Sequence, residues 1–269
     1  MNYPYQKEFN HYCKHERQKA DSTMLVVNRS LTVFWQYLDQ SAINQVQASD
    51  IQNFLNSLET KLGLKENTIN KYLSHIKQYY TFLYSHHLVD QYPIIEVNGR
   101  KFNRHRVYII NWMSHLPEIA QIKSIHPETI MMMLGIAQGY LPDEVLRLRY
   151  KTIIKKIESK SLRKYVKEHR NFDLSDNPYI LGKKFGGYYP NDFHIAERCF
   201  PDRKLIGMPI TLQSLRLSFV YSLLTRKDLT DQQLEQLLHA NDKTLFYYRR
   251  NMQLYNELVE FKLPSTANN

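Results

Sequence analysis

Apolar residues recur at helical intervals through most of the first hundred residues, and this spacing limits the fold more than any other feature. Residues 49–62 read "SDIQNFLNSLETKL", in which Ser49 stands three residues before Gln52, a spacing typical of a capping box at a helix start. The apolar residues that share one face of that helix are Ile51, Phe54, Leu55, Leu58 and Leu62. The same pattern predicts three further helices, at 5–19, 23–38 and 68–86. The N-terminal part is therefore expected to be a compact helical bundle.

The second part of the chain is less uniform. Helical spacing predicts helices near 113–124, 127–138, 191–199, 211–225, 231–239 and 252–262. Between residues 150 and 185 the pattern is ambiguous: "KTIIKKI" and "NPYILGKKF" are compatible with strands, whereas "SKSLRKYVKEH" equally suits a helix. With 8 glycines in 269 residues, an all-β protein or a Rossmann nucleotide binder is disfavoured. We expect a mainly α fold with a small β-sheet.

One break between two helices is specified in detail. In "AQGYLPDEVLRLRY", residues 137–150, Gly139 can end a helix that runs through Ala137, and Pro142 can begin the next one. Leu141, an uncharged aliphatic residue, lies between these two signals.

Charge is distributed unevenly along the chain. Residues 1–97 hold 9 Lys/Arg and 9 Asp/Glu, whereas residues 98–170 hold 15 against 6, and the whole chain has a net charge of +10. A local basic excess of this size is expected of a surface that binds a polyanion such as nucleic acid, although a basic surface kept for solubility is the simpler alternative. The polar, basic stretch "VNGRKFNRHR" contains a glycine and predicts a linker at 98–106, between domains at 1–97 and 107–269.

Other features restrict the setting of the protein. Its two cysteines, Cys13 and Cys199, are far apart, which favours a reducing compartment over a disulfide scaffold. No apolar stretch approaches the length of a membrane span, and the first residues lack a signal-peptide pattern. The sequence therefore predicts a cytoplasmic protein without membrane contact.

The order of these parts resembles the tyrosine recombinases, or phage integrases, over nearly the whole chain. The segment "NTINKYLSHIKQYYTFLYSHHLVDQYP" is similar to the last N-terminal helix and the turn before the linker in that family. "GYLPDEVLRLRY" resembles the first catalytic box, "ITLQSLRLSF" the second, and "QLLHANDKTLFYY" the closing segment. In the last of these, a histidine precedes the nucleophilic tyrosine by nine positions, as His239 precedes Tyr248; Arg216 fits the arginine of the second box.

The resemblance implies an N-terminal helical, SAM-like core-binding domain and a C-terminal mixed α/β catalytic-type domain. It also implies a chemistry in which a tyrosine oxygen attacks a phosphodiester and forms a covalent 3′-phosphotyrosyl link, without metal or cofactor. Two arginines hold the non-bridging oxygens, a lysine on a β-turn protonates the leaving 5′ oxygen, and histidines assist proton transfer. By this resemblance Tyr248, Arg216 and His239 are the candidate catalytic residues.

The sequence departs from the family pattern at positions that carry this chemistry. Leu141 stands where the first arginine is expected, and Gln213 stands where the first histidine is expected. Leucine has no charge and no donor, and glutamine is no acid or base near neutral pH. Moving the register so that Arg147 or Arg149 replaces the missing arginine would break the match at Gly139 and Glu144, so we reject that alignment.

The resulting hypothesis is a sequence-specific double-stranded DNA-binding protein that has lost cleavage and acts as a phage or mobile-element regulator or repressor. The alternatives are an active, divergent recombinase with Tyr248 as its nucleophile, and a protein-interaction module on the same scaffold. The expected DNA-binding residues are Arg100, Lys101, Arg104, Arg106, Lys155, Lys156, Arg216, Arg249 and Arg250. The β-turn lysine remains open among Lys155, Lys156, Lys160 and Lys164.

The expected partner is duplex DNA, without a metal or small-molecule cofactor. The amphipathic segment "MQLYNELVEFKL", 252–263, is expected either to dock on a second copy of the chain, forming a homo-oligomer on DNA, or to fold back in cis.

Overall fold

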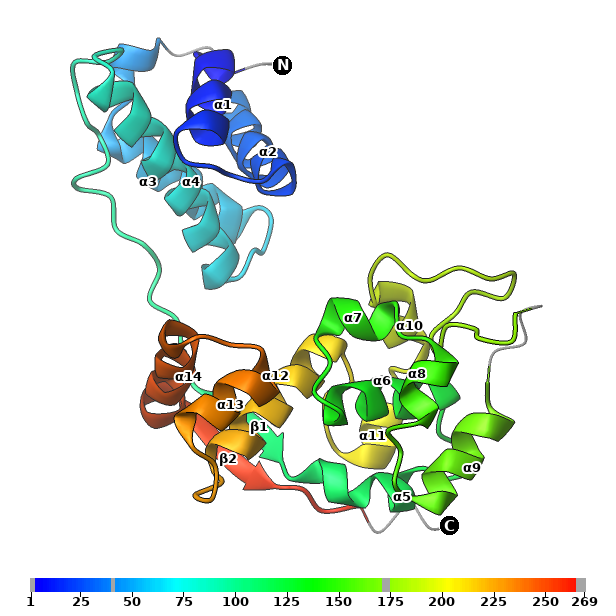
Figure 1. Cartoon of the computed structure of the whole chain (residues 1–269). Coiled ribbons are helices and arrows are strands. Elements are labelled where there is room, and N and C mark those ends of the chain that lie inside the picture. Colours follow the sequence, from blue (N-terminus) through cyan, green and yellow to red (C-terminus); the bar gives the residue numbers. More distant parts are fainter. Residues whose placement is uncertain (1–2, 40–41, 171–174, 265–269) are drawn as a thin grey trace. The chain divides into compact units, whose positions relative to one another are not determined.

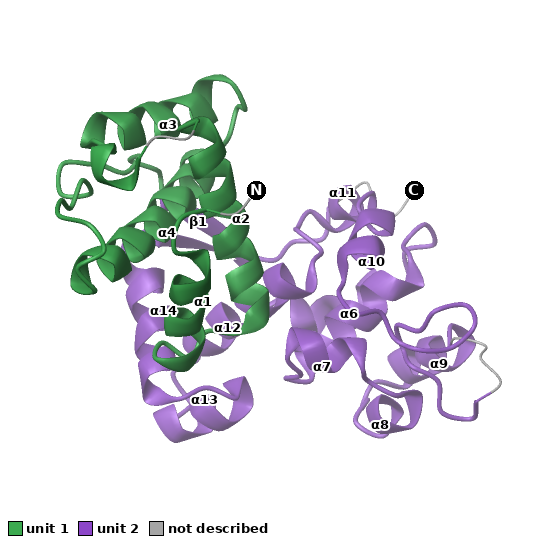
Figure 2. Ribbon diagram, turned by 90° about the horizontal axis from the view of Figure 1, so that it is seen from above, with its two compact units in different colours: residues 1–103 green, residues 104–269 purple. Residues whose placement is uncertain are grey.

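The computed structural model describes residues 3–39, 42–170 and 175–264, and its chain divides into two compact units (Figures 1 and 2). Unit 1 is Met1–Asn103 and unit 2 is Arg104–Asn269. Each unit buries its own hydrophobic core. The division lies inside the 98–106 stretch, whose first residues are attached to unit 1 and whose last residue begins a strand of unit 2.

Unit 1 is a bundle of helices that matches the four predicted stripes. Its α-helices are α1 (Gln6–His15), α2 (Asp21–Tyr37), α3 (Ala48–Thr60) and α4 (Glu66–Ser85), and a 3-10 turn η1 spans Ile43–Gln45. Large aromatic side chains dominate its core; those with almost no exposed surface include Phe9, Phe34, Phe54, Tyr79 and Tyr80. The predicted amphipathic bundle is confirmed.

The start of α3 differs from the predicted capping box at Ser49 and Gln52. The N-cap is Gln47, two residues before Ser49, so the helix begins at Ala48, and the Asp50 carboxylate accepts a hydrogen bond of 2.9 Å from the Gln47 main-chain N–H. A carboxylate in the first turn also interacts favourably with the helix dipole, which a glutamine amide does less strongly. The capping pair is therefore displaced by two residues.

Unit 2 is also mostly helical. Its elements before residue 171 are β1 (Arg106–Ile110), η2 (Trp112–His115), α5 (Leu116–Ile119), α6 (Pro127–Ala137), α7 (Pro142–Leu146), α8 (Tyr150–Ile154) and α9 (Lys160–Glu168). After residue 174 they are α10 (Phe193–Arg198), α11 (Asp202–Ile206), α12 (Leu212–Leu224), α13 (Asp231–Leu238), α14 (Asp242–Tyr255) and β2 (Asn256–Glu260). The prediction of a mainly α fold with a small sheet is confirmed.

The sheet lies elsewhere than the sequence pattern suggested. β1 and β2 pair in parallel, from Arg106 opposite Asn256 to Ile110 opposite Glu260, and α12 packs on β1 while α14 packs on β2 (Figure 1). The predicted helix at 252–262 was wrong in its second half, because α14 ends at Tyr255 and the following residues form β2. The segment therefore folds back in cis.

The ambiguous region at 150–185 is resolved mainly in favour of helices. "KTIIKKI" is not a strand: most of it belongs to α8 and the turn that follows, whereas "SKSLRKYVKEH" contains α9. "NPYILGKKF" contributes only isolated bridges, Arg149 to Tyr179 and Gly182 to Tyr188. Residues 171–174, within this region, lie outside the described part of the chain.

The predicted helix break is confirmed. α6 ends at Ala137, Gly139 has φ +86°, and α7 begins at Pro142 with Leu141 as its N-cap. A side chain at Gly139 would also place its Cβ 3.4 Å from the Leu237 carbonyl oxygen, so glycine suits both the backbone conformation and the close approach. Among the described residues, no helix combines the length and the apolar character needed to cross a bilayer.

Candidate functional site

Arg216 connects the three segments that resemble catalytic boxes. It lies in α12, which begins where the Thr211 hydroxyl accepts a hydrogen bond of 3.1 Å from the Ser214 N–H. Its Nη1 donates to the Gly139 carbonyl at 3.1 Å, and its Nη2 donates to the Leu238 carbonyl at 2.6 Å. With 5% of its surface exposed, Arg216 holds the α6–α7 break and the end of α13 against α12.

Burial has an electrostatic consequence for this guanidinium. Desolvation lowers the pKa of Arg216 from its usual value, while Tyr248 and Glu144 act in the opposite direction. Both residues are thus near enough to interact electrostatically with Arg216. Because two of its N–H groups are bonded to main-chain carbonyls, its expected contact with a DNA phosphate stays a prediction that competes with this structural role.

Leu141 and Gln213 bring no charge to this region. Leu141 is half-buried, and its main-chain N–H donates to the Glu144 carboxylate at 2.7 Å; Gln213 is exposed on the first turn of α12. The spacing between Gly139 and Glu144 therefore has a structural basis, since the first ends one helix and the second stabilises the start of the next.

The two arginines near the end of the first box are engaged elsewhere. Arg149 donates to the Asn177 carbonyl and to the Tyr179 hydroxyl, both at 2.9 Å, and lies 3.8 Å from the centre of the Tyr179 ring. Arg147 lies 5.4 Å from the ring centre of Tyr188. Neither of them shares the contacts of Arg216, which agrees with rejecting the alignment that assigns one of them to the place of the missing arginine.

The closing segment places its histidine and tyrosine in different surroundings. His239 is exposed, and it ends α13 in a left-handed conformation with φ 47°. The Asn241 side chain then caps α14 by accepting from the Thr244 N–H at 3.0 Å. Tyr248 is half-buried on α14, with its ring edge-on to that of Tyr221 at 6.1 Å between centres.

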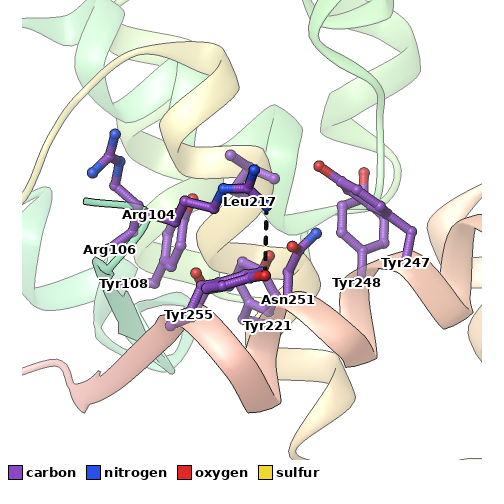
Figure 3. A pocket seen from close by; sticks show the side chains of 10 residues that line it. Arg104, Arg106, Tyr108, Leu217, Tyr221, Tyr247, Tyr248, Asn251 and Tyr255 are labelled. Carbon is purple, nitrogen blue, oxygen red and sulfur yellow. Dashed lines mark hydrogen bonds between the residues drawn. The ribbon is translucent and has the colours of Figure 1, made fainter. Parts of the chain in front are cut away.

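Tyr248 lies at the edge of an open pocket of about 360 Å³ in unit 2 (Figure 3). The residues that line it are Arg104, Arg106, Tyr108, Leu217, Tyr221, Tyr247, Tyr248, Asn251, Tyr255 and Asn256. They come from β1 and the residues just before it, from α12, and from α14 with the start of β2. The pocket is therefore basic on one side and aromatic on the other.

The two arginines of this pocket are oriented differently. Arg104 extends across it and donates to the Tyr255 hydroxyl at 3.5 Å, whereas Arg106 donates to the His105 carbonyl at 2.9 Å. In Figure 3 the hydroxyl groups of Tyr247 and Tyr248 lie at the end of the pocket away from Arg106. Leu217 adds an apolar side chain to the lining.

The other predicted DNA-binding residues are dispersed. Arg100 belongs to unit 1, where it donates to Glu59 at 2.8 Å and to Asn56 at 2.5 Å. Arg249 makes a two-pronged ion pair with Asp231 at 2.5 and 2.9 Å. The remaining members are exposed at the surface: Lys101, Lys155, Lys156 and Arg250. Of these, Lys156 lies 4.5 Å from the ring centre of Tyr140, next to Leu141.

The sequence analysis did not predict two features of this region. Tyr248, Asn251 and Tyr255 are spaced for one helix face, a signal that was available in the sequence but was not used. A basic turn was missed as well: Lys183 and Lys184 lie on a tight turn closed by a hydrogen bond of 3.0 Å from the Lys183 N–H to the Gly187 carbonyl. The region of the four candidate lysines is instead helical or in short turns.

The comparisons with known proteins agree with this architecture. Residues 7–87 match the family model of the phage integrase N-terminal SAM-like domain. No curated protein sequence matches the chain. A structure of a lambda integrase dimer bound to a COC′ core site superimposes with a TM-score of 0.66 at 13% identity, covering 97% of this chain and 100% of that chain.

Two further solved structures are similar. The Tn1549 transposon integrase in complex with circular intermediate DNA gives a TM-score of 0.62 at 12% identity, over 90% of this chain and 94% of that chain. A lambda integrase tetramer bound to a Holliday junction gives 0.65 at 11% identity, over 91% and 76%. Residues 7–87 thus match the model of a phage integrase N-terminal SAM-like domain, and the chain shares the fold of these integrase structures.

Proposed function

We propose that this protein binds double-stranded DNA at a specific sequence without cutting it, and that it acts in the cytoplasm as a regulator or repressor of a phage or mobile element. The observation that carries the proposal is Leu141, an aliphatic residue at the N-cap of α7. A guanidinium is expected at this place in a cleaving relative.

The loss of one positioned donor from a charged transition state typically costs a factor of about 10²–10³ in rate, and that of a phosphate-facing arginine about 10³–10⁵. Arg216 offers limited compensation, because it is buried and donates to two main-chain carbonyls. Gln213 does not replace a histidine in proton transfer. The remaining groups are therefore expected to support little strand cleavage.

DNA binding is supported by three observations. The chain has a net charge of +10, the pocket beside Tyr248 is lined by Arg104 and Arg106, and the similar structures are those of integrases bound to DNA. Lambda integrase was solved as a dimer and as a tetramer. Self-association on DNA is accordingly part of the proposal, although β2 pairs in cis in this chain.

A second candidate is an active, divergent recombinase. It is favoured by the pocket that brings Arg104 and Arg106 to the same cavity as Tyr248. In that case a guanidinium from the segment entering β1 would stabilise the attacked phosphate in place of the residue missing at Leu141. Tyr247, which is 62% exposed, is a competing nucleophile on the same helix.

A nicked suicide substrate separates the two candidates. The duplex is first selected from a random library by binding to the protein, and is then nicked so that cleavage traps a covalent protein–DNA adduct. We expect no adduct, and we expect Tyr248→Phe to leave the dissociation constant within about twofold, because it removes neither charge nor core packing. An adduct that Tyr248→Phe abolishes and Tyr247→Phe preserves would establish the second candidate.

The binding surface can be tested with the same duplex. Arg104→Gln and Arg106→Gln should each weaken binding and reduce the slope of log K against log salt by about 1. Arg226→Gln is the matched control, since Arg226 is exposed and pairs with Asp228 at 2.5 Å outside the pocket. Equal losses in all three variants would mean that only total charge matters and that the pocket is no DNA contact.

A further inference from the structure

Unit 1 has a basic pocket, although acidic and basic residues are equal in number over residues 1–97. The pocket lies between α1, the connection from α1 to α2, and α4, with a volume of about 270 Å³. Its lining residues are Phe9, Tyr12, Cys13, Arg17, Lys19, Ser74, Lys77, Gln78 and Thr81. Three of these nine are cations and none is acidic.

The cations reach the pocket from two separate segments. Arg17 and Lys19 come from the connection after α1, where the Lys19 N–H donates to the Cys13 carbonyl at 3.0 Å. Lys77 comes from the middle of α4, and the Lys19 ammonium donates to Gln78 on the same helix. Contacts between distant parts of unit 1 thus hold the positive charges around one concave surface.

Two neighbouring side chains respond to this positive potential. Burial raises the pKa of the Cys13 thiol, and Lys19 and Arg17 act in the opposite direction by favouring its anion. The pKa of His75 is lowered, first by burial and then by Lys19 and Lys71. Burial is the larger cause of both shifts, but the contribution of the neighbouring cations has the same sign at both side chains: it favours the Cys13 anion and disfavours the His75 cation.

We propose that this pocket binds a phosphate group of the DNA backbone, an inference that rests on the proposed DNA-binding function. Like charges grouped in a pocket that has no acidic lining residue repel one another, and a phosphate relieves that repulsion while accepting hydrogen bonds from several donors. Arg17 and Lys77 supply charge, and Ser74 supplies a hydroxyl group, whereas the Thr81 hydroxyl already donates to the Lys77 main-chain carbonyl at 2.8 Å. Through this pocket unit 1 binds the duplex backbone, although the net charge of unit 1 is small.

The test compares two double variants of the full chain on the selected duplex. Arg17→Gln with Lys77→Gln removes two exposed cations of the pocket, while Lys61→Gln with Lys65→Gln removes two exposed cations at the α3–α4 connection of the same unit. Thermal melting of both variants verifies that the unit remains folded. We expect the pocket variant alone to reduce the slope of log K against log salt by about 1 and to weaken binding by about tenfold at moderate salt.

Equal slopes for the pocket variant, the control variant and the unmodified chain would overturn this inference while leaving DNA binding intact. If the unmodified chain binds no duplex at all, the proposed function itself fails. A second arm melts the free protein in inorganic phosphate against chloride at equal ionic strength. Stabilisation by phosphate that the pocket variant loses, together with an unchanged slope, would assign the pocket to a free phosphorylated ligand and overturn the backbone assignment.

Discussion

Replacing Arg216 by methionine tests whether this arginine is primarily a structural connection in unit 2. The change removes two hydrogen bonds from a charged donor, each contributing about 1.5–3 kcal/mol, and leaves the Gly139 and Leu238 carbonyls without that partner. Part of the loss is offset, because the desolvation that lowers the pKa of Arg216 no longer acts. We expect unit 2 to be destabilised by about 2–4 kcal/mol, which lowers its melting temperature by about 5–12 °C.

Unfolding in guanidinium chloride measures the change in the free energy of unfolding directly, provided that the fluorescence signal comes from unit 2 alone. The chain has two tryptophans, Trp35 in unit 1 and Trp112 in unit 2, so the titration is made in a Trp35→Phe background. Trp112 is fully buried, and its Nε1 donates at 3.1 Å to Ser218, two residues after Arg216 on α12. Its fluorescence therefore reports the packing around the substituted side chain.

Two further variants make the result decisive. Arg216→Lys keeps a positive charge but has a single ammonium, which is poorly shaped to bridge two carbonyls, so it should be destabilised almost as much as the methionine variant. Arg249→Met removes an arginine whose partner is on the surface and should change stability little. If Arg216→Met stays within about 0.5 kcal/mol of the parent while its DNA affinity falls, the structural reasoning is refuted and Arg216 is a phosphate ligand.

Three other perturbations follow from the structure. Phe261→Ala should destabilise unit 2 by about 3–5 kcal/mol in the same titration, because this side chain after β2 is buried; no effect would mean that the segment does not pack in cis. Burial raises the pKa of the Cys199 thiol to about 11. The preference of the folded state for the protonated thiol therefore stabilises the protein fully below the unfolded thiol pKa of about 8.5, and this stabilisation is lost as the pH rises toward 11. Denaturation at pH 8 and pH 10 should show this loss in the parent and a smaller one in Cys199→Ala. Leu141→Arg with Gln213→His should produce a covalent adduct on the suicide substrate. The double change should leave the start of α7 intact, because Leu141 stabilises it through its main-chain N–H, which any side chain at this position retains. An adduct already formed by the parent would contradict the premise that the parent does not cleave DNA.

Local rules were sufficient for the helices of unit 1 and for the break between α6 and α7. Gly139 with φ +86° and Pro142 at the first position of α7 act within a few residues of the chain, so their effect is readable without a structure. The stripes of unit 1 are readable for the same reason, because residues three or four apart share one helix face.

The sheet was not readable in this way. Arg106 pairs with Asn256, so the pattern of either segment alone does not reveal its partner. Asn256–Glu260 continues directly from α14, and its helix-compatible apolar spacing is overridden by pairing with β1. The pocket beside Tyr248 was hidden for the same reason, since Arg104 reaches α14 only through this long-range pairing.

Three residues that retain the recombinase pattern in this chain have structural roles. Glu144 stabilises the start of α7, Gly139 permits a close approach to Leu237, and Arg216 joins three segments through main-chain carbonyls. Leu141 and Gln213, the two departures, contribute no side-chain hydrogen bond to these connections in the described part of the chain. Side chains at such positions can therefore change while the connections that hold the fold persist, which is why the motif alone does not establish catalysis.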